Sequence, residues 1–255
     1  MQKTLSILLL LALGAYAAAC LALFLLQRSL IYFPPSTAAI QAPKITMLTV
    51  PGDLVKVSER PRTGSKAVIY LGGNAEDVSF SLPQLDAAFP DHALYLLHYR
   101  GYSGSSGKPT EQALVADSLL LFDRVLATHP EVVLVGRSLG TGVAVQVASR
   151  RPVRKLVLVT PYDSIAELAA RQFPYFPVRW LLQDTYESGA YAGRIGAPTL
   201  VLAAEHDEVI PAWSTARLVS RFAPGVATQQ VIAGAGHNSI SDGSAYLAAL
   251  AWARQ

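Results

Sequence analysis

Near-continuous apolar runs recur along this chain and constrain its fold more than any other feature of the sequence. They include AVIYLGG, ALYLLHYR, EVVLVG, KLVLVT and TLVLAA. Each has the length and apolar content of a strand buried on both faces of a parallel sheet. Segments with helical spacing separate most of the runs, at 76–89, 111–128, 141–150, 212–222 and 241–253. This alternation predicts an α/β fold, with right-handed crossovers and helices on both faces of a mostly parallel sheet.

Further runs complete a predicted sheet of eight strands. ITMLTV and LVKVSERP flank Pro51-Gly52-Asp53, a turn signal that predicts an opening pair of strands. TQQVIAGAGH is the last and weakest strand pattern. With 255 residues, of which 51% are hydrophobic, the chain can bury one sizeable core. We therefore expect a single domain over 45–255.

An uncharged apolar segment precedes this domain. It runs from Leu5 to Leu26, about 22 residues, which is long enough to cross a bilayer as one helix. Lys3 and Arg28 bracket it. We therefore predict a single-pass transmembrane anchor over 1–28 and a membrane localisation, with the side of the membrane left open.

A cleaved signal sequence, which would release a secreted domain, is the alternative for this segment. AYAAAC, ending at Cys20, offers small residues at which a peptidase could cut. The apolar run continues beyond Cys20 through LALFLL, whereas the apolar region of a signal sequence stops before its cleavage site. We therefore favour the uncleaved anchor. Aromatic residues and prolines follow in LIYFPPSTAAIQAPK and predict a linker over 29–44.

Charge and composition argue against several classes of partner. The formal net charge is +3, but the cations are scattered and aromatic residues do not interleave with them as they do in a nucleic-acid surface. We expect no nucleic-acid partner. The single cysteine excludes an intrachain disulfide. The sequence has no clustered set of histidine and cysteine that would hold a metal, so we expect no metal. We expect no organic cofactor either.

The run EVVLVG leads into a serine that lies between two glycines. In GRSLG, Gly136 and Gly140 flank Ser138, and an alanine- and valine-rich helical pattern follows. This order is typical of a strand-to-helix turn so tight that glycine is needed on both sides. Such a turn strains the serine backbone and exposes its hydroxyl at a helix N-terminus. An ordinary loop with a capping serine would also fit the motif taken alone.

A serine nucleophile needs a base and a carboxylate that orients the base. Among the five histidines, His237 follows the last predicted strand and precedes the last predicted helix, where a loop could bring it over Ser138. The carboxylate belongs at the end of the preceding strand in chain order. HDEVIP places Asp207 there, with Glu205 as the main alternative and Asp163 as a weaker one.

Acyl transfer also needs donors for the oxyanion of its tetrahedral intermediate. The backbone N–H of Leu139, at the start of the helix after Ser138, is one candidate. The loop GGNA at 72–75 is the source of the other, because its glycines let the backbone approach a substrate closely. These features fall at four strand ends in the chain order that a serine hydrolase requires.

From about residue 45 onward the chain resembles the α/β-hydrolase superfamily, and within it the membrane-anchored serine hydrolases of the serine aminopeptidase-like and protein depalmitoylase-like branch. The narrower resemblance is carried by YLGGNAED, HYRGYSGSSGKPTE, GRSLGTGVAVQVA, PYDSIAELA, HDEVIP and GAGHN. The resemblance implies that Ser138 is the nucleophile, Asp207 the orienting acid and His237 the base.

The same resemblance implies backbone oxyanion donors at Leu139 and Asn74. Two positions depart from the pattern of the branch. Gly72 stands where the branch usually has histidine, and Ser103 stands where YRGYG has its last glycine. Both departures bear on the shape of the site and leave the three triad positions in place.

Together these patterns predict a serine hydrolase that cleaves carboxylic ester or thioester bonds through an acyl-enzyme. The short segment between KLVLVT and TLVLAA leaves room for a small cap at most. Its aromatic residues are candidates for an acyl groove, although we expect at least half of them to pack against the sheet. They are Phe173, Tyr175, Phe176 and Trp180. An apolar site beside a membrane suits a small-molecule or lipid-linked acyl substrate. A peptidase of the same fold and a membrane-tethered binding protein without activity are the alternatives.

Overall fold

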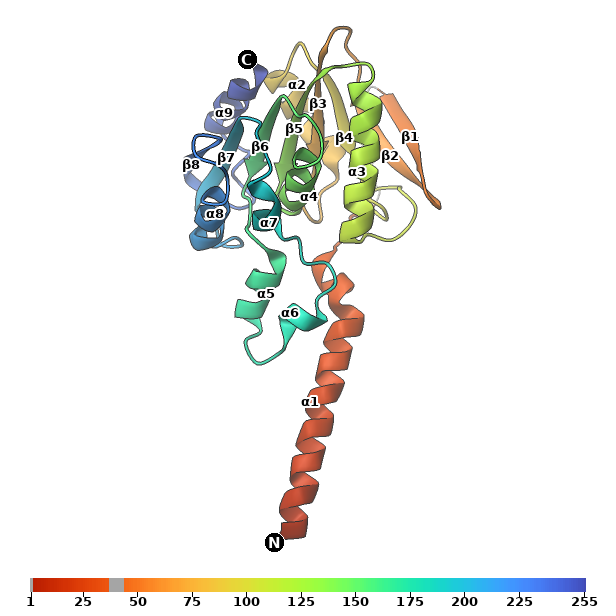
Figure 1. The fold of residues 1–255 in the computed structure, drawn as a ribbon. Coiled ribbons are helices and arrows are strands. Elements are labelled where there is room, and N and C mark those ends of the chain that lie inside the picture. The colour runs from red at the N-terminus through yellow and green to blue at the C-terminus, as the bar shows by residue number, and fades with distance from the viewer. Residues whose placement is uncertain (1, 37–43) are drawn as a thin grey trace.

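The computed structural model describes residues 2–36 and 44–255, which form one sheet covered by helices and a long helix that projects away from it (Figure 1). The strands of the sheet are β1 (Lys44–Val50), β2 (Asp53–Arg60), β3 (Lys66–Leu71), β4 (Ala93–Leu97), β5 (Glu131–Arg137), β6 (Lys155–Val159), β7 (Thr199–His206) and β8 (Ala227–Gly236). Their order is β1-β2-β4-β3-β5-β6-β7-β8. The pairs β1·β2 and β2·β4 are antiparallel and the others are parallel. The predicted eight-stranded, mostly parallel sheet is confirmed.

The helices of the described residues are α1 (Gln2–Ile31), α2 (Leu82–Ala88), α3 (Glu111–Leu126), α4 (Leu139–Ala148), α5 (Ile165–Gln172), α6 (Val178–Leu181), α7 (Ser188–Ala192), α8 (Ala212–Val219) and α9 (Ser244–Arg254), with a 3₁₀ turn at Val78–Ser81. Two apolar clusters bury the faces of the sheet. Ala67 and Ile69 of β3 join the cluster that holds α3, α4 and α8, and Val68 and Tyr70 join the cluster that holds α2 and α9. Neighbouring residues of one strand thus face opposite layers, which is why the strands read as continuous apolar runs.

Several helix boundaries differ from the sequence prediction; α8 ends at Val219 instead of residue 222, and α9 begins at Ser244 instead of residue 241. The predicted helix over 76–89 is a loop, a 3₁₀ turn and then α2. Pro83 lies in the first turn of α2, where a backbone N–H would have no partner within the helix. α4 begins at Leu139, two residues before the prediction, directly after the serine. The segment between β6 and β7 contains α5, α6 and α7. The apolar pattern of the sequence did not predict these helices, because all three are short.

The helix α1 projects beyond the domain and is long and apolar enough to cross a membrane (Figure 1). Its most apolar stretch has a mean hydropathy of 2.5 and is not buried against the protein. A signal sequence meets the same test. α1 continues through Ile31, so the first residues of the predicted linker over 29–44 are helical, and its part over 37–43 lies outside the described residues.

A small cap rises over the carboxyl edge of the sheet beside α1. We call residues 165–182 the cap; they comprise α5, α6 and the loop that joins them. Figure 1 shows the cap projecting from the domain on the same side as α1. The cap is as short as the sequence indicated. It leaves room for the end of α1 to lie next to the carboxyl ends of the strands.

Candidate active site

The turn between β5 and α4 holds Ser138 in a backbone conformation that is rare for a residue with a side chain, with φ 46° and ψ −115°. A Cβ atom added to Gly136 would lie 2.6 Å from the carbonyl oxygen of Gly140, and one added to Gly140 would overlap the carbonyl oxygens of Leu71 and Gly72. Both flanking glycines are therefore required by close backbone packing. Holding a serine at positive φ costs of order 1–3 kcal/mol, which the surrounding packing has to offset.

The structure brings Ser138, His237 and Asp207 into one hydrogen-bonded chain. Nε2 of His237 lies 2.9 Å from Ser138 Oγ, and its Nδ1 lies 2.9 and 3.0 Å from the two carboxylate oxygens of Asp207. A carboxylate can only accept, so Nδ1 carries the proton and Nε2 is left to accept the serine hydroxyl. In this tautomer the imidazole can take a proton from Ser138.

The environment of Asp207 favours its ionised form. Burial alone would raise its pKa, but hydrogen bonds from His237 and from the backbone N–H groups of Ile210 and Val209 lower it below the usual range. The two other acids considered from the sequence lie elsewhere. Glu205 accepts from the backbone N–H of Gly234, and Asp163 is buried against Arg217 on α8.

The loop after β3 lies directly beside the serine. A Cβ on Gly73 would stand 3.6 Å from the Cβ of Ser138, so glycine lets this backbone come close to the serine. Glu76 closes the loop, because its Oε2 accepts the backbone N–H of Gly73 at 2.6 Å and also pairs with Arg137 at 3.3 Å. Sequence reasoning missed Glu76, although it stands in GGNAE, within the quoted motif.

The side chain of Asn74 has a structural role that the sequence did not indicate. Its Oδ1 accepts from the Tyr102 hydroxyl and from the backbone N–H of Phe33, and its Nδ2 donates to the carbonyl oxygen of Ile31 at 2.6 Å. The amide therefore joins the loop after β3 to the end of α1. The backbone of Asn74 remains a candidate oxyanion donor, as does that of Leu139 at the first position of α4.

Comparisons with known proteins agree with this geometry. Residues 66–184 match the family model described as alpha/beta hydrolase fold. An uncharacterised protein of Mycobacterium tuberculosis is 34% identical, covering 88% of this chain and 85% of its own length. The chain belongs to the α/β-hydrolase superfamily.

Relatives of this chain include proteins described as hydrolases. The lysophosphatidylserine lipase ABHD12 of Macaca fascicularis is 31% identical to this α/β hydrolase over 62% of the chain, which spans 45% of that lipase. Solved structures share the fold at lower identity. The esterase Pf2001 of Pyrococcus furiosus has a TM-score of 0.66 at 14% identity, covering 86% of this chain and 97% of its own. Membership of the superfamily, together with these relatives, supports hydrolase activity for this chain.

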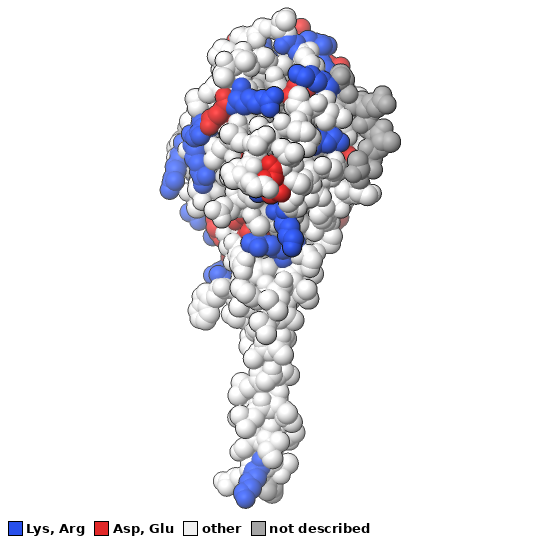
Figure 2. Space-filling model, turned by 90° about the vertical axis from the view of Figure 1, so that its right-hand side faces the viewer, with Lys and Arg blue, Asp and Glu red and all other residues white. Residues whose placement is uncertain are grey.

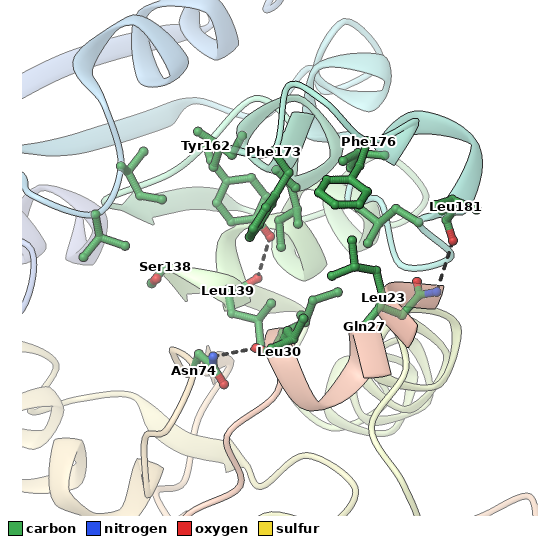
Figure 3. A pocket seen from close by; sticks show the side chains of 18 residues that line it. Leu23, Gln27, Leu30, Asn74, Ser138, Leu139, Tyr162, Phe173, Phe176 and Leu181 are labelled. Atoms are coloured by element: carbon green, nitrogen blue, oxygen red, sulfur yellow. Dashed lines mark hydrogen bonds between the residues drawn. The ribbon is translucent and has the colours of Figure 1, made fainter. Parts of the chain in front are cut away.

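A pocket of about 340 Å³ opens at Ser138 and extends between α1 and the cap (Figure 3). Its walls are mostly apolar. Besides Ser138, Leu139, Asn74 and Tyr162, they comprise Leu23, Gln27, Leu30 and Ile31 of α1, Val209 and Ile210 after β7, and Ile165, Leu168, Ala169, Phe173, Phe176, Val178, Leu181 and Leu182 of the cap. A pocket of this size and lining accommodates an apolar chain whose reacting end lies at the serine.

The cap aromatics divide differently from the prediction. Phe173 and Phe176 line the pocket, whereas Tyr175 and Trp180 are 85% and 89% exposed. None of the four packs against the sheet, so the expectation that at least half would do so is wrong. The cap is too short to fold back on the strands, and its aromatic side chains point toward α1 and solvent.

Proposed function

We propose that this α/β hydrolase is a serine hydrolase that cleaves carboxylic esters, or thioesters, of apolar or lipid-linked acyl groups. The observation that carries the proposal is the hydrogen-bonded chain from Ser138 through His237 to Asp207 at the end of an apolar pocket. The lipase relatives support a lipid-like substrate. The long apolar helix α1 supports a location at a membrane, as a single-pass anchor.

The first half of the reaction transfers the acyl group to the enzyme. Ser138 Oγ attacks the carbonyl carbon while Nε2 of His237 takes the hydroxyl proton, and the carbonyl π electrons move onto oxygen. Backbone N–H groups of Leu139 and Asn74 stabilise that oxyanion. When the carbonyl re-forms, the bond to the leaving group breaks and the imidazolium protonates the departing oxygen or sulfur. Asp207 stabilises the imidazolium throughout.

The second half releases the acid. Water enters the space left by the leaving group, and Nε2 of His237 takes one of its protons as the oxygen attacks the acyl carbonyl. The tetrahedral intermediate collapses, the bond to Ser138 Oγ breaks, and the proton returns to the serine. The products are a carboxylic acid and an alcohol or thiol, and the residues named here return to their starting states.

The test uses the full chain in detergent with a chain-length series of nitrophenyl esters. We expect Ser138→Ala to lower kcat by about 10⁴ or more, because nucleophile and base act as a unit. Ser220→Ala, at the exposed end of α8, is the matched control and should keep full activity. A fluorophosphonate should label the wild type and not Ser138→Ala. If wild-type protein hydrolyses no ester and is not labelled, the chain is better described as a binding protein of this fold.

A further inference from the structure

The membrane-type helix α1 forms one wall of the pocket that leads to Ser138. Its last turns contribute Leu23, Gln27, Leu30 and Ile31 to the lining, opposite the cap (Figure 3). An anchor that serves only as a tether has no reason to enter the site. Here the same helix that is apolar enough to cross a bilayer also bounds the space that an acyl group would occupy.

Specific hydrogen bonds hold α1 in this position. Gln27, a buried amide in an otherwise apolar stretch, donates to the carbonyl oxygen of Leu181 at 3.1 Å and accepts the backbone N–H of Gln183 at 2.7 Å. The next residue, Arg28, pairs with the buried Asp184 at 3.1 Å. At the end of the helix Asn74 bonds the Ile31 carbonyl (Figure 3). The wall is thus fixed to the cap and to the loop beside the nucleophile.

The length of α1 sets the depth of the cap in a bilayer. The hydrocarbon core needs about 20 helical residues. Lys3 has to stay outside it, so a span that begins at Leu5 reaches about Phe24. The cap touches α1 well inside this span, because the Tyr16 hydroxyl donates to the carbonyl oxygen of Tyr175 at 2.9 Å. The tip of the cap therefore lies at the level of the lipid chains and not above the headgroups.

The surface of this region fits such a position. Tyr16 and Phe176 stack with ring centroids 5.8 Å apart, and the nearby Tyr175 and Trp180 expose large, mostly apolar rings. The exposed cations of the cap, Arg171 and Arg179, both pair with Glu167. Figure 2 shows that the shaft of α1 carries no charged side chain between its basic tip and the domain. Leu23, on the pocket wall, lies close to the predicted edge of the hydrocarbon.

We infer that the substrate is a bilayer lipid whose acyl chain enters laterally from the leaflet, between α1 and the cap, and that α1 selects for it as a wall of the site. The inference rests on the proposed function and adds the route of entry and the specificity-determining role of Leu23 and Leu30. An acyl chain that takes this route passes from hydrocarbon into an apolar pocket, and the apolar chain is never exposed to water.

The test narrows the pocket by substitutions on α1. It uses the full chain, reconstituted in vesicles of non-hydrolysable diether phosphatidylcholine. Leu23→Trp and Leu30→Trp place a larger side chain in the pocket. Leu25→Trp is the matched control, because Leu25 is 69% exposed on the lipid-facing side and does not line the pocket. The readout is the ratio of kcat/KM for nitrophenyl palmitate, which dissolves in the bilayer, to that for the water-soluble nitrophenyl butyrate.

We expect the ratio to fall about tenfold or more in Leu23→Trp and Leu30→Trp, and to stay within about twofold of wild type in Leu25→Trp. Labelling by a fluorophosphonate reports that a variant has a folded site. A labelled Leu23→Trp and Leu30→Trp pair with an unchanged ratio overturns the inference while leaving the proposed function standing. Wild-type protein that hydrolyses neither ester contradicts the proposed function, and the inference then fails with it.

Discussion

The backbone N–H of His237 donates a 3.1 Å hydrogen bond to Oε2 of Glu208, the residue that follows Asp207 in the chain. Two neighbouring carboxylates thus bind one histidine: Asp207 accepts a hydrogen bond from its imidazole, and Glu208 accepts one from its backbone. The bond also lowers the pKa of Glu208, so this carboxylate stays an acceptor in mildly acidic solution. Glu208 is therefore a candidate positioning residue for His237.

We expect Glu208→Ala to lower kcat about three- to tenfold with little change in KM, because the loop that carries His237 loses an anchor while the pocket is untouched. Glu208→Gln keeps an acceptor oxygen and should restore kcat to within about twofold of wild type. Steady-state kinetics with a nitrophenyl ester measures both. Asp91→Ala, an exposed carboxylate just before β4 and remote from His237, is the control. Equal losses in the Ala and Gln variants would contradict a positioning role.

Glu76 offers a second prediction, on the other side of Ser138. Glu76→Ala frees the Gly73 N–H and the Arg137 guanidinium, so the loop that carries the Asn74 backbone can shift. Loss of one oxyanion donor costs about 10²–10³ in kcat, and a displaced donor should cost about tenfold or more. Glu131→Ala, at the opposite end of β5, is the matched control. A kcat for Glu76→Ala within about twofold of wild type would rule out this role.

The proximity of the three predicted triad residues follows from the sequence through topology. Ser138 comes after β5, Asp207 after β7 and His237 after β8, and parallel strands bring their carboxyl ends to one edge of the sheet. The choice between Asp207 and Glu205 was not settled by the pattern. β7 continues through His206, so Glu205 still belongs to the strand, and its carboxylate reaches the backbone of β8 instead of His237.

The docking of α1 could not be predicted, because it depends on pairs far apart in the chain. Tyr16 stacks on Phe176, and Gln27 donates a hydrogen bond to the carbonyl oxygen of Leu181. Hydropathy shows only that α1 is apolar and does not indicate which of its residues contact the cap. Gln27 was the available signal, since a buried amide in an apolar helix needs partners. A partner of Gln27, Leu181, lies in the cap, whose helices are too short to be predicted from the sequence pattern.

Gly140 gives a prediction on stability. In Gly140→Ala the new methyl group would overlap the carbonyl oxygens of Leu71 and Gly72, which are fixed in and after a central strand. We expect the free energy of unfolding to fall by about 3 kcal/mol or more. Gly196→Ala, where nothing lies within 4 Å of the added atom, should change it by no more than about 0.5 kcal/mol. Chemical denaturation of the full chain in detergent measures both, and similar stabilities would refute the packing argument.

His98 is a buried histidine outside the predicted triad. Its Nε2 lies 2.8 Å from Ser58 Oγ, and its side chain is 1% exposed. Burial, together with the positive charge of Lys56, lowers its pKa to about 4, and the attraction of Asp77 only partly opposes this. The folded protein therefore holds this histidine neutral at pH values where an unfolded chain would protonate it.

This difference predicts an acid-sensitive stability. An unfolded histidine has a pKa near 6.5, so below about pH 6.5 the unfolded state binds a proton that the folded state refuses until about pH 4. Neutral His98 therefore makes its full contribution to the free energy of unfolding above about pH 6.5. As the pH falls from there to about 4, up to roughly 3 kcal/mol of that free energy is lost. His98→Gln has no such group and should lose less stability between pH 7 and pH 4.5, whatever its stability at neutral pH. The exposed His206→Gln is the control and should follow the wild type. Parallel pH profiles for wild type and His98→Gln would show that His98 is protonated in the folded state and that its burial does not set the acid limit.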